Sequence, residues 1–417
     1  MSRPSMGFLL FSALAALTMQ PSAGDLGAAL RRSPLAAPAA LPASAPLRGS
    51  IVIPLRRLPA RGYEGDDGED ASFYVGTVFV GHPAQALQVS FDTASGHVVL
   101  PHRGCQTVAC KEHRRFSPWE STTAMDINTN GTEVLPGSRL VRGKARRDVV
   151  TLSYTQSDLG SGNATGVLVR DSVCVGPEAC VDMEIMAALS MDEEPFRGMP
   201  NDGIVGLGLQ ALAAGPLCSF LGRLFEGSKG VRPQIGIAFH AESGELHIGG
   251  HERAPLAAPL RWFPVDHPQD GFWQVAIQAV VVGGVKVAGC QKGCHGIVDT
   301  GVSRLGVQKS HLGPLIAALS TSRVEGGACQ GPDLTLDLGD MALTLKAADY
   351  ADDDCEVQLG SLDLEEPAYT GVFALGAGVL RRYYAAFDWE QQKLAFAPMA
   401  ARAPQPVGSD SEDVFVV

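Results

Sequence analysis

The sequence predicts a mostly β protein built from two related halves. It contains 48 Gly and 27 Pro among 417 residues, which is typical of a chain with many turns. Runs of β-branched and aromatic residues of strand length recur from Phe73 to Pro398. Helical patterns are confined to residues 209–227 and 309–321. Because strands outnumber helices so strongly, we expect a β fold.

Composition narrows the class of protein. The chain is 45% hydrophobic and 19% charged, so it can bury a large core, and its length suggests two or three domains. Its net charge of -12 argues against a nucleic-acid partner, since a phosphate backbone attracts basic surfaces.

The N-terminus has the layout of a secretory signal peptide, which we place at residues 1–23. Arg3 precedes a 13-residue apolar run from Gly7 to Met19, and small residues follow. The run is too short to span a bilayer comfortably, and no later apolar run reaches 18 residues, so we expect no membrane span. We expect the protein in the secretory pathway, outside the cell or in a lysosome- or vacuole-like compartment.

The remaining chain divides by composition. We expect a pro-segment or linker at 24–71, which is Ala/Pro-rich and then basic and acidic, and an acidic flexible tail at 401–417. Between them we expect an N-terminal β lobe at 72–240 and a C-terminal β lobe at 241–400.

Secretion determines how the nine cysteines are interpreted. In an oxidising compartment, closely spaced cysteines are disulfide candidates before they are metal ligands. The candidate pairs are Cys105–Cys110, Cys174–Cys180 and Cys290–Cys294, with Cys329–Cys355 as a longer loop and Cys218 left over. Zinc is the alternative, because His113 and His295 lie near cysteines, but no zinc-finger spacing and no HExxH motif is present. We expect no metal and no organic cofactor.

An internal repeat joins the two halves. "SFDTAS" at 90–95 has a counterpart in "IVDTGVS" at 297–303, each an apolar run ending in Asp-Thr and a small residue. Each is followed downstream by two apolar residues and a Gly, at 204–206 and at 374–376. Taken alone, the stretch around Asp92 favours a turn residue over a catalytic one. The repeat reverses this and favours two facing loops that carry Asp92 and Asp299.

Two facing carboxylates have a specific chemistry. They cannot both ionise cheaply at hydrogen-bonding distance, so they share a proton and one apparent pKa rises. The ionised carboxylate can act as a general base on water, while the protonated one polarises a carbonyl. Thr93 and Thr300 can bond across to the opposite loop, and Ser95 can donate to the outer oxygen of Asp92.

These motifs resemble those of the pepsin-like (A1 family) aspartic endopeptidases, over nearly all of residues 72–400. Five segments carry the resemblance in the correct order: the two Asp-Thr motifs, "RFSPWESTT", "NDGIVGLGL", "CQKGCHGIVDTG" and "VLRRYYAAFDWEQQKLAFAP". The resemblance implies a bilobal fold with a central cleft for an extended peptide, and Cys329 and Cys355 match the family's third bridge. It also implies a flap hairpin on which Tyr154 matches the flap tyrosine, and dyad support from Thr93, Ser95, Thr300 and Gly301. A strand aromatic packed on its neighbours is the alternative for Tyr154.

The chain departs from the family's pattern at three positions close to the dyad. Ala94 replaces the usual Gly, and its Cβ restricts φ. Val302 stands where Ser or Thr normally donates to the second Asp, so we expect a less acidic dyad and an activity optimum closer to neutral. Val99 replaces the Trp that bonds the flap tyrosine, and the flap is longer by several residues.

Two further features concern processing. "IVIPLRR" resembles the start of the family's inhibitory pro-peptide, which implies a zymogen; a solvated basic linker through Arg56, Arg57 and Arg61 is the alternative. Sequons at Asn130 and Asn163 make the chain a candidate glycoprotein.

The sequence therefore predicts a secreted, monomeric aspartic endopeptidase, a hydrolase that acts in proteolysis on extended polypeptides through Asp92 and Asp299. The rival is a catalytically silent protein of the same fold that serves as a binding, inhibitor or receptor module. Ala94, Val302 and the altered flap favour the rival, whereas the presence of both aspartates favours the enzyme.

Overall fold

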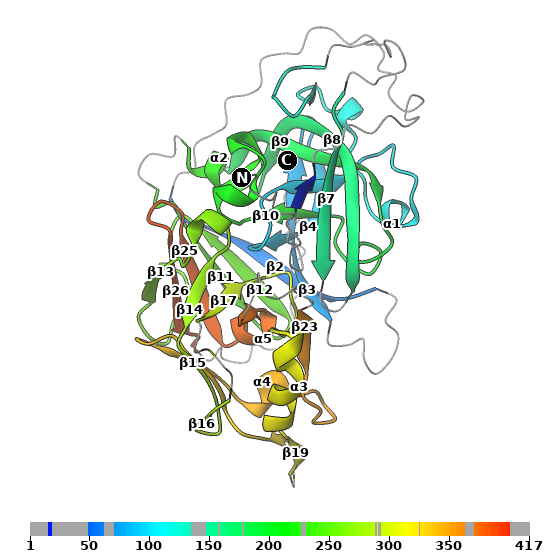
Figure 1. Ribbon diagram of the computed structural model, residues 1–417. Helices are drawn as coiled ribbons and strands as arrows, with labels where there is room; N and C mark the ends of the chain where they lie inside the picture. Colours follow the sequence, from blue (N-terminus) through cyan, green and yellow to red (C-terminus); the bar gives the residue numbers. More distant parts are fainter. Residues whose placement is uncertain are drawn as a thin grey trace, which may run out of the picture.

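The architecture is mostly β and has two lobes, as the sequence predicts (Figure 1). The computed structural model describes residues 16–18, 49–61, 71–134, 147–156, 159–176, 179–226, 231–287, 290, 293–324, 326–362 and 371–400. The expected acidic tail at 401–417 and most of the expected signal peptide lie outside these residues.

One sheet of 15 strands contains the N-terminal lobe and continues into the strands that join the lobes. Its order is β1 (Ala16–Thr18), β7 (Val150–Gln156), β8 (Gly160–Cys174), β9 (Cys180–Met191), β5 (Val98–Pro101), β10 (Gly203–Gly206), β4 (Gln85–Asp92), β3 (Ser72–Val80), β2 (Ile51–Pro59), β12 (Ser243–Ile248), β11 (Gln234–Phe239), β25 (Tyr383–Asp388), β26 (Lys393–Pro398) and β13 (Arg261–Pro264), with β6 (Met125–Ile127) paired to β8. The expected lobe boundary at 240/241 falls in the turn between β11 and β12, which pair directly.

Smaller sheets build the C-terminal lobe. The first has the order β14 (Gln274–Ile277), β17 (Cys294–Val298), β24 (Val372–Leu375), β18 (Leu305–Gln308) and β23 (Leu359–Leu362). The second has the order β16 (Val285–Lys286), β15 (Ala279–Val282), β21 (Leu334–Asp337) and β22 (Ala342–Leu345), and β19 (Ser322–Arg323) pairs with β20 (Cys329–Gln330).

Helices are short. They are α1 (Val108–Lys111), α2 (Phe220–Phe225), α3 (Lys309–Ala318), α4 (Ala347–Tyr350) and α5 (Ala377–Leu380). Within the helical pattern at 209–227, the described residues form two 3₁₀ turns, η2 (Gln210–Leu212) and η3 (Pro216–Cys218), followed by α2. The backbone is extended at Ala213, at Gly215 and again at Ser219, so no continuous helix forms. Pro216 also lacks the N–H that a helix running through it would need. No helix among the described residues is long and apolar enough to cross a membrane.

The repeat found in the sequence corresponds to a repeated strand arrangement. β10 runs parallel to β4 and antiparallel to β5, and β24 runs parallel to β17 and antiparallel to β18. In this register Gly206 lies opposite Asp92, and Leu375 lies opposite Val298. A Cβ at Gly206 would lie 2.6 Å from the backbone O of Ser95, which explains why this strand ends in Gly.

The segment "IVIPLRR" is a structural strand. β2 pairs with β12 on one side and with β3 on the other. Arg57 donates from Nε to Ser72 Oγ over 2.8 Å, and Arg61 donates from its guanidinium to the backbone O of Glu112 and of Pro200. These two arginines therefore hold the strand against the lobe, which neither the inhibitory nor the solvated-linker interpretation included.

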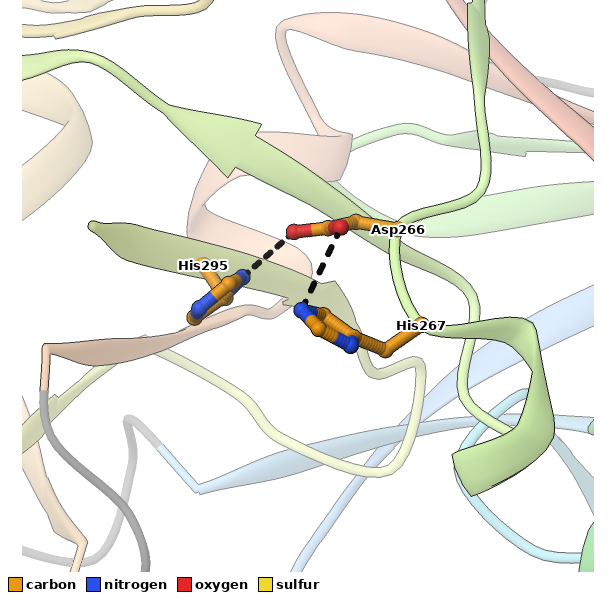
Figure 2. A group of neighbouring side chains, drawn as sticks. All are labelled: Asp266, His267 and His295. Atoms are coloured by element: carbon orange, nitrogen blue, oxygen red, sulfur yellow. Dashed lines mark hydrogen bonds and ion pairs between the residues drawn. The ribbon is translucent and has the colours of Figure 1, made fainter.

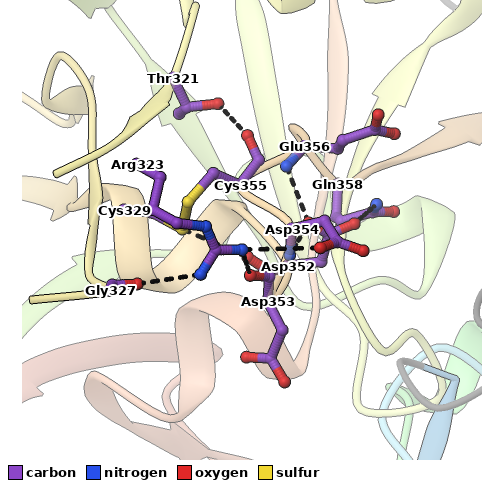
Figure 3. A network of polar contacts seen from close by, with 10 residues as sticks. All are labelled: Thr321, Arg323, Gly327, Cys329, Asp352, Asp353, Asp354, Cys355, Glu356 and Gln358. Atoms are coloured by element: carbon purple, nitrogen blue, oxygen red, sulfur yellow. Dashed lines mark hydrogen bonds and ion pairs between the residues drawn. A yellow bond between two sulfur atoms is a disulfide. The ribbon is translucent and has the colours of Figure 1, made fainter.

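Eight cysteines form four disulfides, and Cys218 is free and buried. The bonds are Cys105–Cys110, Cys174–Cys180, Cys290–Cys294 and Cys329–Cys355. The last one anchors a polar network shown in Figure 3, in which the Asp352 carboxylate accepts from the backbone N–H of Glu356 over 2.7 Å. Within the described residues, these bonds leave no cysteine pair available as a zinc site.

Candidate active site

The two repeated aspartates are buried at equivalent strand ends. Asp92 is the last residue of β4 and is 1% exposed, and Asp299 follows β17 and is 0% exposed. Each apolar run extends far enough to carry its Asp to the interior, where a lone carboxylate would be costly. Such burial is expected of a functional pair.

The two loops are joined by a symmetric exchange of threonine hydrogen bonds. Thr93 Oγ1 donates to the Val298 carbonyl over 2.7 Å and accepts from Thr300 N over 3.1 Å. In the reverse direction, Thr300 Oγ1 donates to the Phe91 carbonyl over 2.5 Å and accepts from Thr93 N over 3.0 Å. The structure thus brings together the cross-loop pair that the sequence predicts.

One oxygen of each aspartate is held by its own loop. Ala94 N donates to Asp92 Oδ1 over 2.9 Å, and Gly301 N donates to Asp299 Oδ1 over 2.9 Å. The Ala94 methyl group is accommodated in an apolar cluster with Leu212, Phe272 and Val302. Ala94 therefore keeps the backbone donor that Gly supplies in the second loop.

The electrostatics couple the two carboxylates. Burial raises the pKa of Asp92 well above its usual range, and the charge of Asp299 raises it further. The Ser95 hydroxyl and the Ala94 N–H act in the opposite direction. At least one proton is therefore retained by this pair to a higher pH than an isolated Asp would allow.

Three buried polar atoms near the pair have no hydrogen-bond partner among the described residues. They are Asp92 Oδ2, Ser95 Oγ and Tyr154 OH. Ser95 therefore does not make the expected hydrogen bond to the outer oxygen of Asp92 at normal distance and angle. Its hydroxyl still lies close enough to lower the pKa of Asp92. Unpaired buried atoms are costly to maintain and fit a place for a polar ligand such as water or a substrate carbonyl.

Tyr154 lies on the hairpin formed by β7 and β8, opposite Gly162. Tyr154 is 2% exposed, and its ring packs edge-on against Phe196, with ring centroids 5.5 Å apart. Burial raises its pKa, and so does the charge of Asp92. Val99 is buried in the same apolar cluster and offers the hydroxyl no side-chain partner, so the substitution noted in the sequence has a direct structural consequence. Residues 157 and 158 of the hairpin lie outside the described residues.

Sequence reasoning missed two supporting groups. Ser303 Oγ accepts from Ser72 N over 2.9 Å and donates to Ser72 O over 3.0 Å, which ties β3 to the second Asp loop. His97 is buried, accepts from Ala214 N over 3.0 Å at Nε2, and has its pKa lowered to about 4 by burial. The adjacency of His97 and Ser303 to the motifs was the available signal, but their partners are remote in sequence.

The two histidines considered as zinc ligands, His113 and His295, have hydrogen-bond partners other than cysteine. His113 Nε2 is 3.0 Å from the Phe196 carbonyl, and burial lowers its pKa. His295 Nδ1 instead lies 2.7 Å from Asp266 Oδ2, in a separate cluster described below.

Both glycosylation candidates are exposed. Asn130 Oδ1 accepts from Thr132 N over 3.0 Å, and Asn163 Oδ1 accepts from Ser153 Oγ over 2.7 Å. Exposure meets the first requirement for modification, and occupancy stays a prediction.

Comparison with known proteins places this geometry in a family. The profile described as eukaryotic aspartyl protease matches residues 73–158 and 156–399. Cathepsin E of Oryctolagus cuniculus is 27% identical over 344 residues, which cover 78% of this chain and 80% of that protein. Gastricsin of Cavia porcellus is 28% identical over 81% of this chain and 83% of its own length. Pepsin-2B of Gadus morhua is 28% identical over 78% and 96%.

The residues matched by the family profile include both Asp-Thr loops and the flap hairpin. The family and the class of enzyme expected from the sequence are confirmed. The chain belongs to the eukaryotic aspartyl protease family.

Proposed function

We propose that the protein is an endopeptidase that hydrolyses extended polypeptides with a water molecule activated by Asp92 and Asp299. The observation that carries this proposal is the buried, electrostatically coupled pair of carboxylates on loops locked together by Thr93 and Thr300.

The reaction proceeds without a covalent intermediate. The ionised carboxylate of the pair takes a proton from water, whose oxygen forms a bond to the carbonyl carbon, while the protonated carboxyl gives its proton to the carbonyl oxygen. The tetrahedral diol then collapses: the C–N bond breaks, the amine nitrogen receives a proton from the pair, and one hydroxyl of the diol gives its proton to the pair as it becomes the new carbonyl, so that the pair again holds one proton. Burial supports this scheme because it keeps one carboxyl protonated at pH values where an exposed Asp ionises.

The flap and the unpaired atoms support a role for an extended substrate. Tyr154 OH, Ser95 Oγ and Asp92 Oδ2 are the buried polar atoms available to water or a carbonyl. Substrates cleaved between bulky apolar residues follow from the family resemblance. The four disulfides support a secretory or lysosome-like location, because such bonds persist in oxidising compartments.

A binding module is the second candidate, and it is favoured by Val302 and by the unpaired Tyr154 hydroxyl. Val302 cannot donate a hydrogen bond from its side chain, and Tyr154 has lost the partner that Trp supplies in the family. Against it stands the intact hydrogen bonding of both Asp loops.

Digestion of a denatured protein between pH 2 and 8 decides between them. We expect cleavage that is blocked by a transition-state-mimicking peptide inhibitor. Its pH optimum should lie above about pH 3, towards neutral. A folded, processed protein that cleaves nothing but binds the inhibitor would support the binding module. Activity that survives both Asp92→Asn and Asp299→Asn would refute the mechanism.

A further inference from the structure

A second cluster of ionisable side chains lies outside the dyad, at the beginning of β17. We propose that Asp266, His267 and His295 form a binding site for a divalent transition metal, with Zn²⁺ as the best fit (Figure 2). Asp266 and His267 lie in the loop that follows β13, and His295 is the second residue of β17.

The three side chains converge. One ligand atom from each lies within 4.8 Å of the others. His295 Nδ1 is 2.7 Å from Asp266 Oδ2, and His267 Nε2 is 3.5 Å from Asp266 Oδ1. The two imidazole rings approach edge to face with centroids 5.5 Å apart. Small side-chain rotations would bring such atoms to the 2.0–2.2 Å ligand distances that are typical of zinc.

The ligand types select the metal. Two imidazoles and one carboxylate are a ligand set that zinc sites use, with a fourth position for water. Mg²⁺ and Ca²⁺ prefer oxygen ligands and are disfavoured by two imidazoles. The side chains of His267, Asp266 and His295 are 53%, 29% and 27% exposed, so an ion can enter and water can complete its coordination.

The backbone conformation of His267 is unusual and bears on where its imidazole lies. His267 has a φ of 47°, in the left-handed region that non-glycine residues seldom occupy. Hydrogen bonds fix this conformation, since the His267 carbonyl accepts from Asp270 N over 3.0 Å and from Gln274 Nε2 over 3.4 Å. The strained loop therefore presents the imidazole towards Asp266.

An outer partner is also present. The Gln269 side-chain amide lies 3.3 Å from His267 Nδ1, which leaves Nε2 facing Asp266. Metal-bound histidines usually bond an outer group through their second ring nitrogen, and an amide can do so after exchanging its O and N positions.

The site would join two segments that are far apart in sequence. β14 pairs with β17, and Asp266 N donates to the Gln274 carbonyl over 2.9 Å. A bound ion would cross-link the loop after β13 to the strand that ends at Asp299. We therefore expect metal binding to stabilise the C-terminal lobe.

Titration of the metal-free, full-length protein with Zn²⁺ at neutral pH tests the proposal. We expect one saturable site by calorimetry, no binding of Mg²⁺, and a Zn²⁺-dependent rise in Tm. His267→Asn and His295→Gln should each weaken Zn²⁺ binding by about 100-fold or more, because losing a direct ligand should cost at least as much as losing a group that only bonds a ligand. Asn is chosen at position 267 because it tolerates the left-handed φ.

Two control variants make the result specific. His311→Gln changes a half-buried histidine elsewhere in the same lobe and should leave binding unchanged. Asp92→Asn should bind Zn²⁺ like the wild type, which separates this site from the peptidase mechanism. Absence of stoichiometric binding, or undiminished binding by both His267→Asn and His295→Gln, would overturn the proposal.

Discussion

The loop around Asp92 and the loop around Asp299 make the same hydrogen bonds to each other and the same backbone hydrogen bond to their carboxylates, but they differ in the side chain that follows. Both donate a backbone N–H to the inner oxygen at 2.9 Å, and both threonines bond to the opposite loop. The next residue differs: Ser95 follows Ala94, whereas Val302 follows Gly301.

This difference separates the residues that join the two loops from those that adjust the pKa of one carboxylate. The threonine exchange needs both partners, because removing one hydroxyl leaves two buried backbone groups without a bond. The residue after the small one lies next to a single carboxylate, so a change there should alter the ionisation of that carboxylate more than the joining of the two loops. The predictions below test that division, beginning with the largest effect.

Removing either carboxylate should abolish catalysis. Asp92→Asn and Asp299→Asn should each lower kcat/KM for peptide hydrolysis by at least about 10³-fold, because each loses a group that moves a proton. The exposed residue Asp340 provides a control, and Asp340→Asn should keep full activity. Unequal losses, with one variant near the wild type, would show that only one loop is catalytic.

The threonine exchange should dominate stability. Thr93→Val or Thr300→Val should each lower the free energy of unfolding by about 2–3 kcal/mol, because each leaves buried backbone groups unpaired. Thr→Ser at the same positions keeps the hydroxyl and should cost less. Urea unfolding measures both. We also expect the Val double variant to lose less than the sum of the single losses. Strict additivity would mean that the loops are held independently.

Ionisation of the pair should cost stability as pH rises. The folded-state pKa of Asp92 is raised, so its stabilising contribution is complete below the unfolded value of about 3.9 and is lost as pH passes through the folded pKa. Asp92→Asn cannot ionise and should therefore gain stability relative to the wild type between pH 4 and pH 7. Denaturant midpoints at these two pH values test this, and an unchanged difference between the two proteins would contradict it.

Substitutions at Ser95 and Val302, which follow the small residue of each loop, should shift the pH profile and have the smallest effect. Val302→Thr adds a donor near Asp299, favours the ionised form and should move the pH profile of kcat to lower pH by less than about one unit, since one net hydrogen bond is worth about 1 kcal/mol. Ser95→Ala should move it upward. Movement of both profiles in the same direction would refute the assigned roles.

Local patterns predicted much of this molecule. The Asp-Thr repeat, the Gly-ending triplets at 204–206 and 374–376, and the close cysteine pairs are patterns of neighbouring residues. The structure places the triplets beside the strands that carry the Asp-Thr loops and bonds the three close cysteine pairs. The helix expected over 209–227 is interrupted where the backbone is extended, at Ala213, Gly215 and Ser219, and the spacing of its apolar residues gave no sign of these breaks.

Contacts between distant segments left no such pattern. The bonding of Ser72 to Ser303 spans 231 positions, and the packing of Phe196 on Tyr154 depends on where β9 ends. His295 drew attention through the nearby Cys290–Cys294 bridge, yet its partner Asp266 comes from the loop after β13. These arrangements depend on tertiary structure alone.

A double-mutant cycle on peptide hydrolysis tests the central claim most directly. If Asp92 and Asp299 share one proton and activate one water, kcat/KM of the folded Asp92→Asn/Asp299→Asn variant should be no lower than that of either single variant, because each loss already disables the unit. Losses that multiply in the double variant would contradict the shared mechanism.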